Sequence, residues 1–67
     1  MRIQVNGEFR EVDEQCSLED LTRMLDLKAE RLAIELNGEV VRRIDWQRMI
    51  LNDEDKVEIV HFVGGGC

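Results

Sequence analysis

Cysteine, aromatic residues and histidine are all scarce in this sequence. Its 67 residues include two cysteines, two phenylalanines, one tryptophan and one histidine. Cys16 and Cys67 form neither a Cys-x-x-Cys pair nor a metal-binding pattern with His61. We therefore expect neither a disulfide framework nor a zinc site, and the fold must rest on its apolar core.

Long apolar runs and excess positive charge are also missing. No run approaches the length of a membrane-spanning helix, and the N-terminus lacks the apolar region of a signal peptide, so we expect a soluble, cytoplasmic protein. The formal net charge is −6, from 15 acidic and 9 basic residues. Such a surface repels phosphate backbones and anionic lipid, so we expect neither nucleic acid nor a membrane as partner.

The short length limits what the chain can enclose. A single domain of this size is near the lower limit for a core without metal or disulfide support. It can place one helix against one sheet, but it has little room for an enclosed pocket with a preorganised catalytic site. We therefore do not expect a free-standing enzyme.

The first Asn-Gly pair predicts a β-hairpin. Residues 1–5 alternate apolar and polar side chains, Asn6-Gly7 tolerates the positive φ angles of a tight turn, and residues 8–12 return as a second strand. Phe9 and Val12 have opposite parity. We therefore expect a bulge or an early end to the pairing.

Ser17 and Asp20 predict the start of a helix, because their spacing is that of a capping box. Glu19 and Asp20 place favourable negative charge in its first turn. Apolar residues then recur at helical spacing and form a stripe for the core: Leu18, Leu21, Met24 and Leu25. We expect Leu27 to fold back after the helix and residues 28–31 to form a polar connection.

The second Asn-Gly pair predicts another hairpin. Residues 32–36 alternate, Asn37-Gly38 supplies the turn, and residues 39–41 form a short return strand. Residues 42–51 fit neither the helical nor the strand period, so we expect an irregular segment with a helical turn after Asp45 as N-cap. We assign its tryptophan, Trp46, to packing, because one aromatic ring alone provides no stacking platform.

Residues 56–63 predict the last strand, entered from the acidic turn at residues 52–55. Strand alternation places Val60 and Phe62 on the face that Lys56 and Glu58 mark as solvated. An exposed apolar pair at this place is a candidate docking site, and scattered surface apolarity is an equal alternative.

Three glycines follow that strand: Gly64, Gly65 and Gly66, with Cys67 last. Without Cβ atoms their backbone can lie extended in a narrow channel and approach another molecule closely. This suits a chain end that serves as a substrate, and a frayed terminus is the alternative. We divide the chain into a domain of residues 1–63 and a flexible tail of residues 64–67.

The element order β-β-α-β-β-β predicts an α+β fold, with a mixed sheet of about five strands and one main helix across one face. The helix and the sheet would then bury one set of apolar side chains between them. The predicted core comprises Ile3, Val5, Leu18, Leu21, Leu25, Ile34, Leu36, Val57 and Ile59.

Over nearly its whole length the chain resembles the ThiS-type sulfur carrier proteins of the ubiquitin-like β-grasp class, which includes the MoaD carriers. Most specific is the order of Asn37-Gly38-Glu39-Val40-Val41 before Trp46, an acidic turn and Val63-Gly64-Gly65-Gly66. Asn6-Gly7 and the leucines at 18–27 support it. The short length and the Val-Gly-Gly-Gly ending favour ThiS over MoaD.

The resemblance implies a co-substrate of other enzymes, with no catalytic residue, metal or bound cofactor of its own. An activating enzyme of ThiF or MoeB type would use ATP and Mg²⁺ to adenylate Gly66, with Gly64 and Gly65 threaded into its channel. A persulfide donor would supply the sulfur that displaces AMP. The thiocarboxylate would then give sulfur to a ThiG-type thiazole synthase for thiamine. Molybdopterin and cysteine pathways share this carrier fold and tail and stay open.

Two positions depart from the family pattern. Members commonly have Asp-Gly-Asp before the last strand, where this chain has Asp53-Glu54-Asp55, and they normally end on glycine, where this chain continues to Cys67. Cys67 could be removed by a protease, serve as a thiol handle, or come from cloning.

Two other functions stay open at this point. The chain could be a non-covalent β-grasp interaction module that uses the Val60 and Phe62 face, with the tail incidental. It could also be a ubiquitin-like modifier joined to lysines through Gly66. Sulfur replacing oxygen on the tail would separate the carrier from both.

Overall fold

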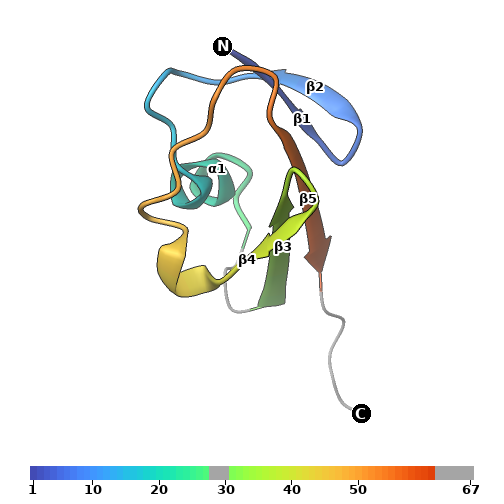
Figure 1. The fold of residues 1–67 in the computed structure, drawn as a ribbon, viewed down its shortest axis with the longest axis vertical. Helices are drawn as coiled ribbons and strands as arrows, with labels where there is room; N and C mark the ends of the chain where they lie inside the picture. The colour runs from blue at the N-terminus through green and yellow to red at the C-terminus, as the bar shows by residue number, and fades with distance from the viewer. Residues whose placement is uncertain (28–30, 62–67) are drawn as a thin grey trace.

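The computed structural model describes residues 1–27 and 31–61, which form a five-stranded mixed sheet with one α-helix. The elements in chain order are β1 (Arg2–Val5), β2 (Glu8–Glu11), α1 (Leu18–Met24), β3 (Leu32–Leu36), β4 (Glu39–Val41), the 3-10 helix η2 (Arg43–Asp45) and β5 (Lys56–His61). The strand order is β2-β1-β5-β3-β4, with β1 parallel to β5 and the other pairs antiparallel (Figure 1). The predicted architecture is confirmed.

Both Asn-Gly pairs form the predicted tight turns. Asn6 and Gly7 have φ angles of 51° and 84°, and the second pair has 53° and 88°. In the first hairpin the register is regular over the four described pairs, from Val5 opposite Glu8 to Arg2 opposite Glu11. Met1 and Val12 then exchange two further hydrogen bonds, at 2.8 and 2.9 Å, so the expectation of a bulge or an early end to the pairing was wrong. Phe9 and Val12 differ in parity only because they face opposite sides of the sheet.

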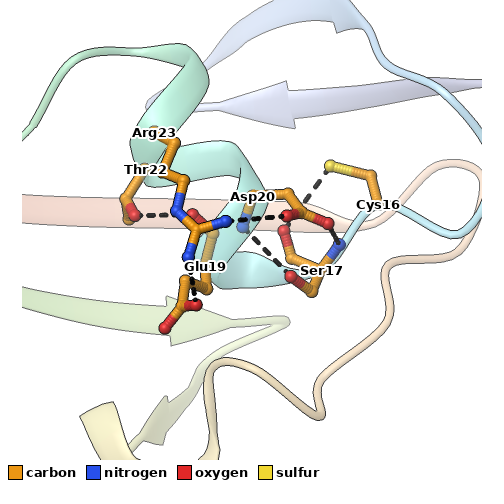
Figure 2. Close-up of polar contacts among 6 residues, drawn as sticks. All are labelled: Cys16, Ser17, Glu19, Asp20, Thr22 and Arg23. Carbon is orange, nitrogen blue, oxygen red and sulfur yellow. Dashed lines mark hydrogen bonds and ion pairs between the residues drawn. The ribbon is translucent and has the colours of Figure 1, made fainter.

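The predicted capping box starts α1 (Figure 2). The backbone N–H of Asp20 donates to the Ser17 Oγ at 3.0 Å, and the Ser17 N–H donates to the Asp20 Oδ2 at 3.1 Å. The Arg23 guanidinium also lies 2.8 Å from the Glu19 carboxylate, one turn earlier. Local sequence therefore determines where this helix begins.

The core lies between α1 and one face of the sheet. Six of the nine predicted core residues are buried, and three are partly buried against them: Leu25, Leu36 and Ile59. Met24 was assigned to the core wrongly, because it is 53% exposed. Successive helical residues are rotated by about 100°, so Thr22, which is buried, completes the stripe of Leu18, Leu21 and Leu25, and Met24 points away.

The segment between β4 and β5 contributes core residues of its own and runs around α1 (Figure 1). Trp46 is buried as predicted, and its Nε1 donates to the Val41 carbonyl at 2.8 Å. The predicted helical turn does follow Asp45, because its carbonyl accepts from the backbone N–H groups of Arg48 and Met49 at 3.0 and 3.1 Å. Asp45 itself is the last residue of the 3-10 helix, however, and its carboxylate accepts from the Arg48 side chain at 3.0 Å and not from a backbone N–H. The N-cap role predicted for Asp45 was therefore wrong.

Some predicted features lie outside the described residues. These are residues 28–30 of the polar connection, the end of the last strand at residues 62–63, and the predicted domain boundary at residue 63. Leu27 does fold back, because its N–H donates to the Thr22 carbonyl at 3.0 Å. Within residues 1–27 and 31–61, no helix is long and apolar enough to cross a membrane.

Candidate functional site

The predicted acceptor, Gly66, lies outside the described residues, as do Gly64, Gly65, Cys67 and the docking candidate Phe62. The structure describes the strand that leads to them, β5, as far as His61. β5 pairs with β1 on one side and with β3 on the other. The last described residue of this central strand is therefore three positions before Gly64 in the sequence.

The Asn6 side chain binds the backbone of β5. The Ile59 N–H donates to the Asn6 Oδ1 at 2.7 Å, and the Asn6 Nδ2 donates to the Ile59 carbonyl at 3.2 Å. The backbone N–H of Asn6 donates to the Val57 carbonyl at 2.9 Å. Asn6 thus continues the parallel pairing of β1 with β5 by one more step, through its side chain.

The Asn37 side chain makes two hydrogen bonds at the start of β5, one to its backbone and one to a neighbouring carboxylate. The Lys56 N–H donates to the Asn37 Oδ1 at 2.9 Å, and the Asn37 Nδ2 donates to the Asp55 Oδ1 at 3.0 Å. The sequence pattern predicts only a turn role for both asparagines. The missed signal is that asparagine adds a donor and an acceptor to its tolerance of positive φ.

The sheet face opposite α1, here called the open face, carries exposed apolar side chains. Val60 is 51% exposed and lies opposite Ala33 on β3, which confirms that its side chain is solvent-facing. Val40 on the edge strand β4 is 70% exposed and lies diagonal to Ala33. Val40 is not among the predicted docking residues, although alternation through β4 places it on this face.

Acidic side chains adjoin the apolar positions on the open face. Glu35 lies opposite Glu58 on β5 and opposite Val40 on β4. Like charges facing one another across a sheet are unfavourable in the isolated protein. A partner with a basic surface would relieve this repulsion and gain from charge complementarity.

Cys16 is buried at the N-terminal end of α1, where its Sγ lies 3.5 Å from the Ser17 carbonyl (Figure 2). Burial raises the pKa of the Cys16 thiol, and the negative charges of Asp20 and Asp13 act in the same direction. The thiolate is the reactive form of cysteine, so this environment disfavours nucleophilic chemistry. We assign Cys16 to packing.

Comparison with known proteins identifies the family. The sequence profile of the ThiS family matches residues 3–66, which is nearly the whole chain. The chain belongs to the ThiS family. It is 44% identical over 64 residues to the uncharacterized protein ycf40 of Porphyra purpurea, covering 96% of this chain and 90% of that protein. It is 32% identical over 65 residues to the sulfur carrier protein ThiS of Bacillus subtilis, covering 96% and 98%.

Solved structures agree with this ThiS assignment. The crystal structure of the thiamine biosynthesis protein ThiS from Geobacter metallireducens matches with a TM-score of 0.85 at 38% identity, over 98% of this chain and all of that one. The expected ubiquitin-like β-grasp fold is therefore confirmed. The chain is also 38% identical over 66 residues to the thiazole synthase of Magnetococcus marinus, of which it spans only 20%.

Proposed function

We propose that this ThiS-family chain is a sulfur carrier whose terminal glycine, Gly66, is adenylated and converted to a thiocarboxylate that donates sulfur for the thiazole of thiamine. The observation that carries this proposal is that the family match extends through the glycine run to residue 66. The names of the Bacillus and Geobacter relatives support sulfur carriage and thiamine biosynthesis, respectively.

The chemistry accounts for the form of the chain end. A carboxylate is a poor electrophile until its oxygen becomes part of a good leaving group. Hydrolysis of the amide bond between Gly66 and Cys67 by a protease would first free the Gly66 carboxylate. One of its oxygens would then attack the α-phosphorus of ATP and release pyrophosphate, giving an acyl-adenylate. The terminal sulfur of a persulfide would then attack the carbonyl carbon and release AMP, and a second thiol would cleave the remaining S–S bond to leave the thiocarboxylate.

In this proposal the folded domain holds and presents the tail, and the partner enzymes supply the catalytic groups. The activating enzyme, of ThiF or MoeB type, would bind ATP and Mg²⁺. Val60 on the open face, together with Phe62 beyond the described residues, would dock beside its active site. Ala33 and Val40 extend the apolar surface next to Val60, and the facing Glu35 and Glu58 favour a basic partner surface.

The acceptor of the sulfur would be a ThiG-type thiazole synthase. The similarity to part of the Magnetococcus thiazole synthase supports this partner, since a ThiS-like sequence there belongs to the same polypeptide as the synthase. We propose the cytoplasm as the compartment, because the thiol that cleaves the S–S bond in the last step must be reduced, as thiols in that compartment are.

Intact mass tests the proposal. The chain, with and without Cys67, would be incubated with ATP, a purified activating enzyme and a persulfide donor. A mass change corresponding to sulfur replacing one oxygen would support the carrier function. An unchanged mass in both forms, with binding to the enzyme retained, would favour a non-covalent interaction module, and an isopeptide-linked species would favour a ubiquitin-like modifier.

A further inference from the structure

We propose that Asn6 is a positioning residue for the reactive tail: its side chain holds the end of β5 and so sets the direction in which the chain leaves the sheet. This inference rests on the proposed carrier function. It deepens that function by naming a residue outside the tail and outside the open face on which the reaction depends.

The backbone of β1 cannot hold the end of β5 by itself. Its pairing with β5 finishes with Val5 beside Val57, and the chain then turns away at Gly7. The last backbone bond from this side runs from the Asn6 N–H to the Val57 carbonyl at 2.9 Å. After Val57, the described hydrogen bonds to the β5 backbone from the β1 side are the two that the Asn6 side chain makes with Ile59.

Asparagine is well suited to this position. Its φ angle of 51° lies in the left-handed region, which asparagine, aspartate and glycine tolerate best. Its side-chain amide offers one acceptor and a donor group, as a peptide unit does, so it can pair with both the N–H and the carbonyl of Ile59. Glycine has no side chain, and an ionised aspartate has no donor for the carbonyl.

Ile59 lies close to the last described residue of β5. It is two residues before His61, where the described strand ends. On the other side, β3 pairs with β5 as far as His61, opposite Leu32. With Asn6 in place β5 is held from both sides at Ile59, and without the Asn6 side chain the end of β5 would be held from the β3 side alone.

This arrangement predicts a particular kinetic effect. Docking depends on side chains of the open face, which Asn6 does not form, so binding to the activating enzyme should be preserved. Alignment of the Gly66 carboxylate with ATP depends on where the strand ends, and small misplacements of reacting groups slow the chemical step strongly. Loss of the Asn6 amide should therefore lower kcat more than it raises KM.

The second hairpin provides a matched control. Asn37 has a φ angle of 53°, precedes a glycine and makes two side-chain hydrogen bonds, as Asn6 does. It acts at Lys56, the first residue of β5. Asn6→Gly and Asn37→Gly remove the same chemical group from Asn-Gly turns at opposite ends of β5. The Asn6 amide bonds two backbone groups of Ile59, whereas the Asn37 amide bonds the Lys56 N–H and the Asp55 carboxylate.

The first measurement is amide hydrogen exchange in the full chain, which needs no partner enzyme. Asn6→Gly should speed exchange at Ile59 by about tenfold and leave Lys56 unchanged, and Asn37→Gly should do the reverse. The second measurement is ATP-dependent pyrophosphate release with a purified activating enzyme. Each variant would be made both as the full chain and as the chain ending at Gly66. It would be compared with the parent in the form in which the parent reacts.

Asn6→Gly should lower kcat by at least about fivefold, with a KM within about twofold of the parent value. For Asn37→Gly, both kcat and KM should stay within about twofold of the parent values. Asn6→Asp keeps an acceptor for the Ile59 N–H but places a carboxylate against the Ile59 carbonyl. It should also lower kcat, and it serves as the test if Asn6→Gly does not fold. Equal effects of the two glycine variants on kcat, or no effect of either, would overturn the positioning role. A parent chain inert in both forms would instead refute the proposed function, and the positioning role with it.

Discussion

Arg2 holds Glu54 in the turn that leads into β5. The Glu54 N–H donates to the Arg2 carbonyl at 2.7 Å, and the Arg2 Nη2 lies 3.2 Å from the Glu54 Oε2. Glu54 has a φ angle of 71°, in the left-handed region that favours glycine. This is the position at which the resemblance to ThiS carriers leads one to expect Asp-Gly-Asp, so the chain adopts a glycine-like conformation without the glycine.

The first prediction concerns this turn. Glu54→Gly should be more stable than Glu54→Ala by about 1 kcal/mol, because both lose the side-chain contact with the Arg2 guanidinium but only glycine accepts the positive φ without steric conflict. Chemical denaturation of the two variants measures the difference. Equal midpoints would show that the turn relaxes away from the left-handed conformation when the glutamate is removed.

The second prediction concerns the core. Leu21 on α1 is fully buried, so Leu21→Ala should lower the free energy of unfolding by about 2–5 kcal/mol through lost transfer energy and a cavity. Met24 lies on the same helix and is 53% exposed, which makes Met24→Ala the matched control, expected to change stability by less than about 1 kcal/mol. Thermal or urea unfolding would compare them. Similar losses for the two variants would contradict the assigned helix face.

The third prediction concerns docking on the open face. Val60→Asp should weaken binding to the activating enzyme by at least about tenfold, because it places a charge in an apolar contact. Ile44→Asp is the control, since Ile44 is 70% exposed but lies in η2, outside the sheet. Calorimetric titration would measure both affinities after each variant has been shown to fold. If Ile44→Asp weakens binding as much as Val60→Asp does, net charge and not the open face governs the interaction.

The same face is predicted to include Phe62. Phe62→Asp should weaken binding in the same titration while leaving the unfolding temperature close to that of the parent, because its side chain is expected to face solvent. A large loss of stability would show that Phe62 is buried and that the alternation predicted for the end of the last strand is wrong.

The fourth prediction concerns pH. The raised pKa of Cys16 means that the thiol stays protonated in the folded chain at a pH where the unfolded chain already ionises it. Its contribution to stability should therefore be complete below the ordinary thiol pKa of 9.0 and decline as the pH rises through the folded value. The difference in unfolding free energy between the parent and Cys16→Ala isolates this group, because Cys67 is present in both. A difference that stays constant into alkaline pH would contradict the assignment.

The fifth prediction concerns Cys67. If Gly66 is the acceptor, its carboxylate must be free, and the amide bond to Cys67 conceals it. The chain ending at Gly66 should be adenylated directly, and the full chain should be inert until a protease removes Cys67. Pyrophosphate release with a purified activating enzyme compares the two forms. Equal rates without loss of cysteine by mass would refute both the need for processing and the Gly66 assignment.

A variant of the tail tests the need for glycine itself. Gly66→Ala in the shortened chain should react poorly, because a methyl group enters the narrow channel and glycine-only conformations are lost. An undiminished rate would show that the activating enzyme tolerates a side chain at this position.

Much of this fold could be predicted from the sequence, because it depends on interactions between residues that are close together in the chain. The capping box at Ser17 and the turns at Asn6-Gly7 and Asn37-Gly38 depend on groups a few residues apart, so their chemistry is visible in the local order of side chains. Strand alternation likewise placed Val57 inside and Val60 outside. The resemblance to the ThiS family could also be recognised from the sequence, because it is a pattern of residue types, and the family match over residues 3–66 confirms it.

Only the tertiary structure showed how distant segments hold the strand that carries the tail. Asn6 and Ile59 are 53 residues apart, and their pairing depends on β1 and β5 lying side by side. The exposure of Met24 was equally hidden, because a short helix offers several apolar stripes and the partners across the core choose among them. Contacts between residues far apart in the sequence depend on how the whole domain packs, so the local order of residues does not predict them.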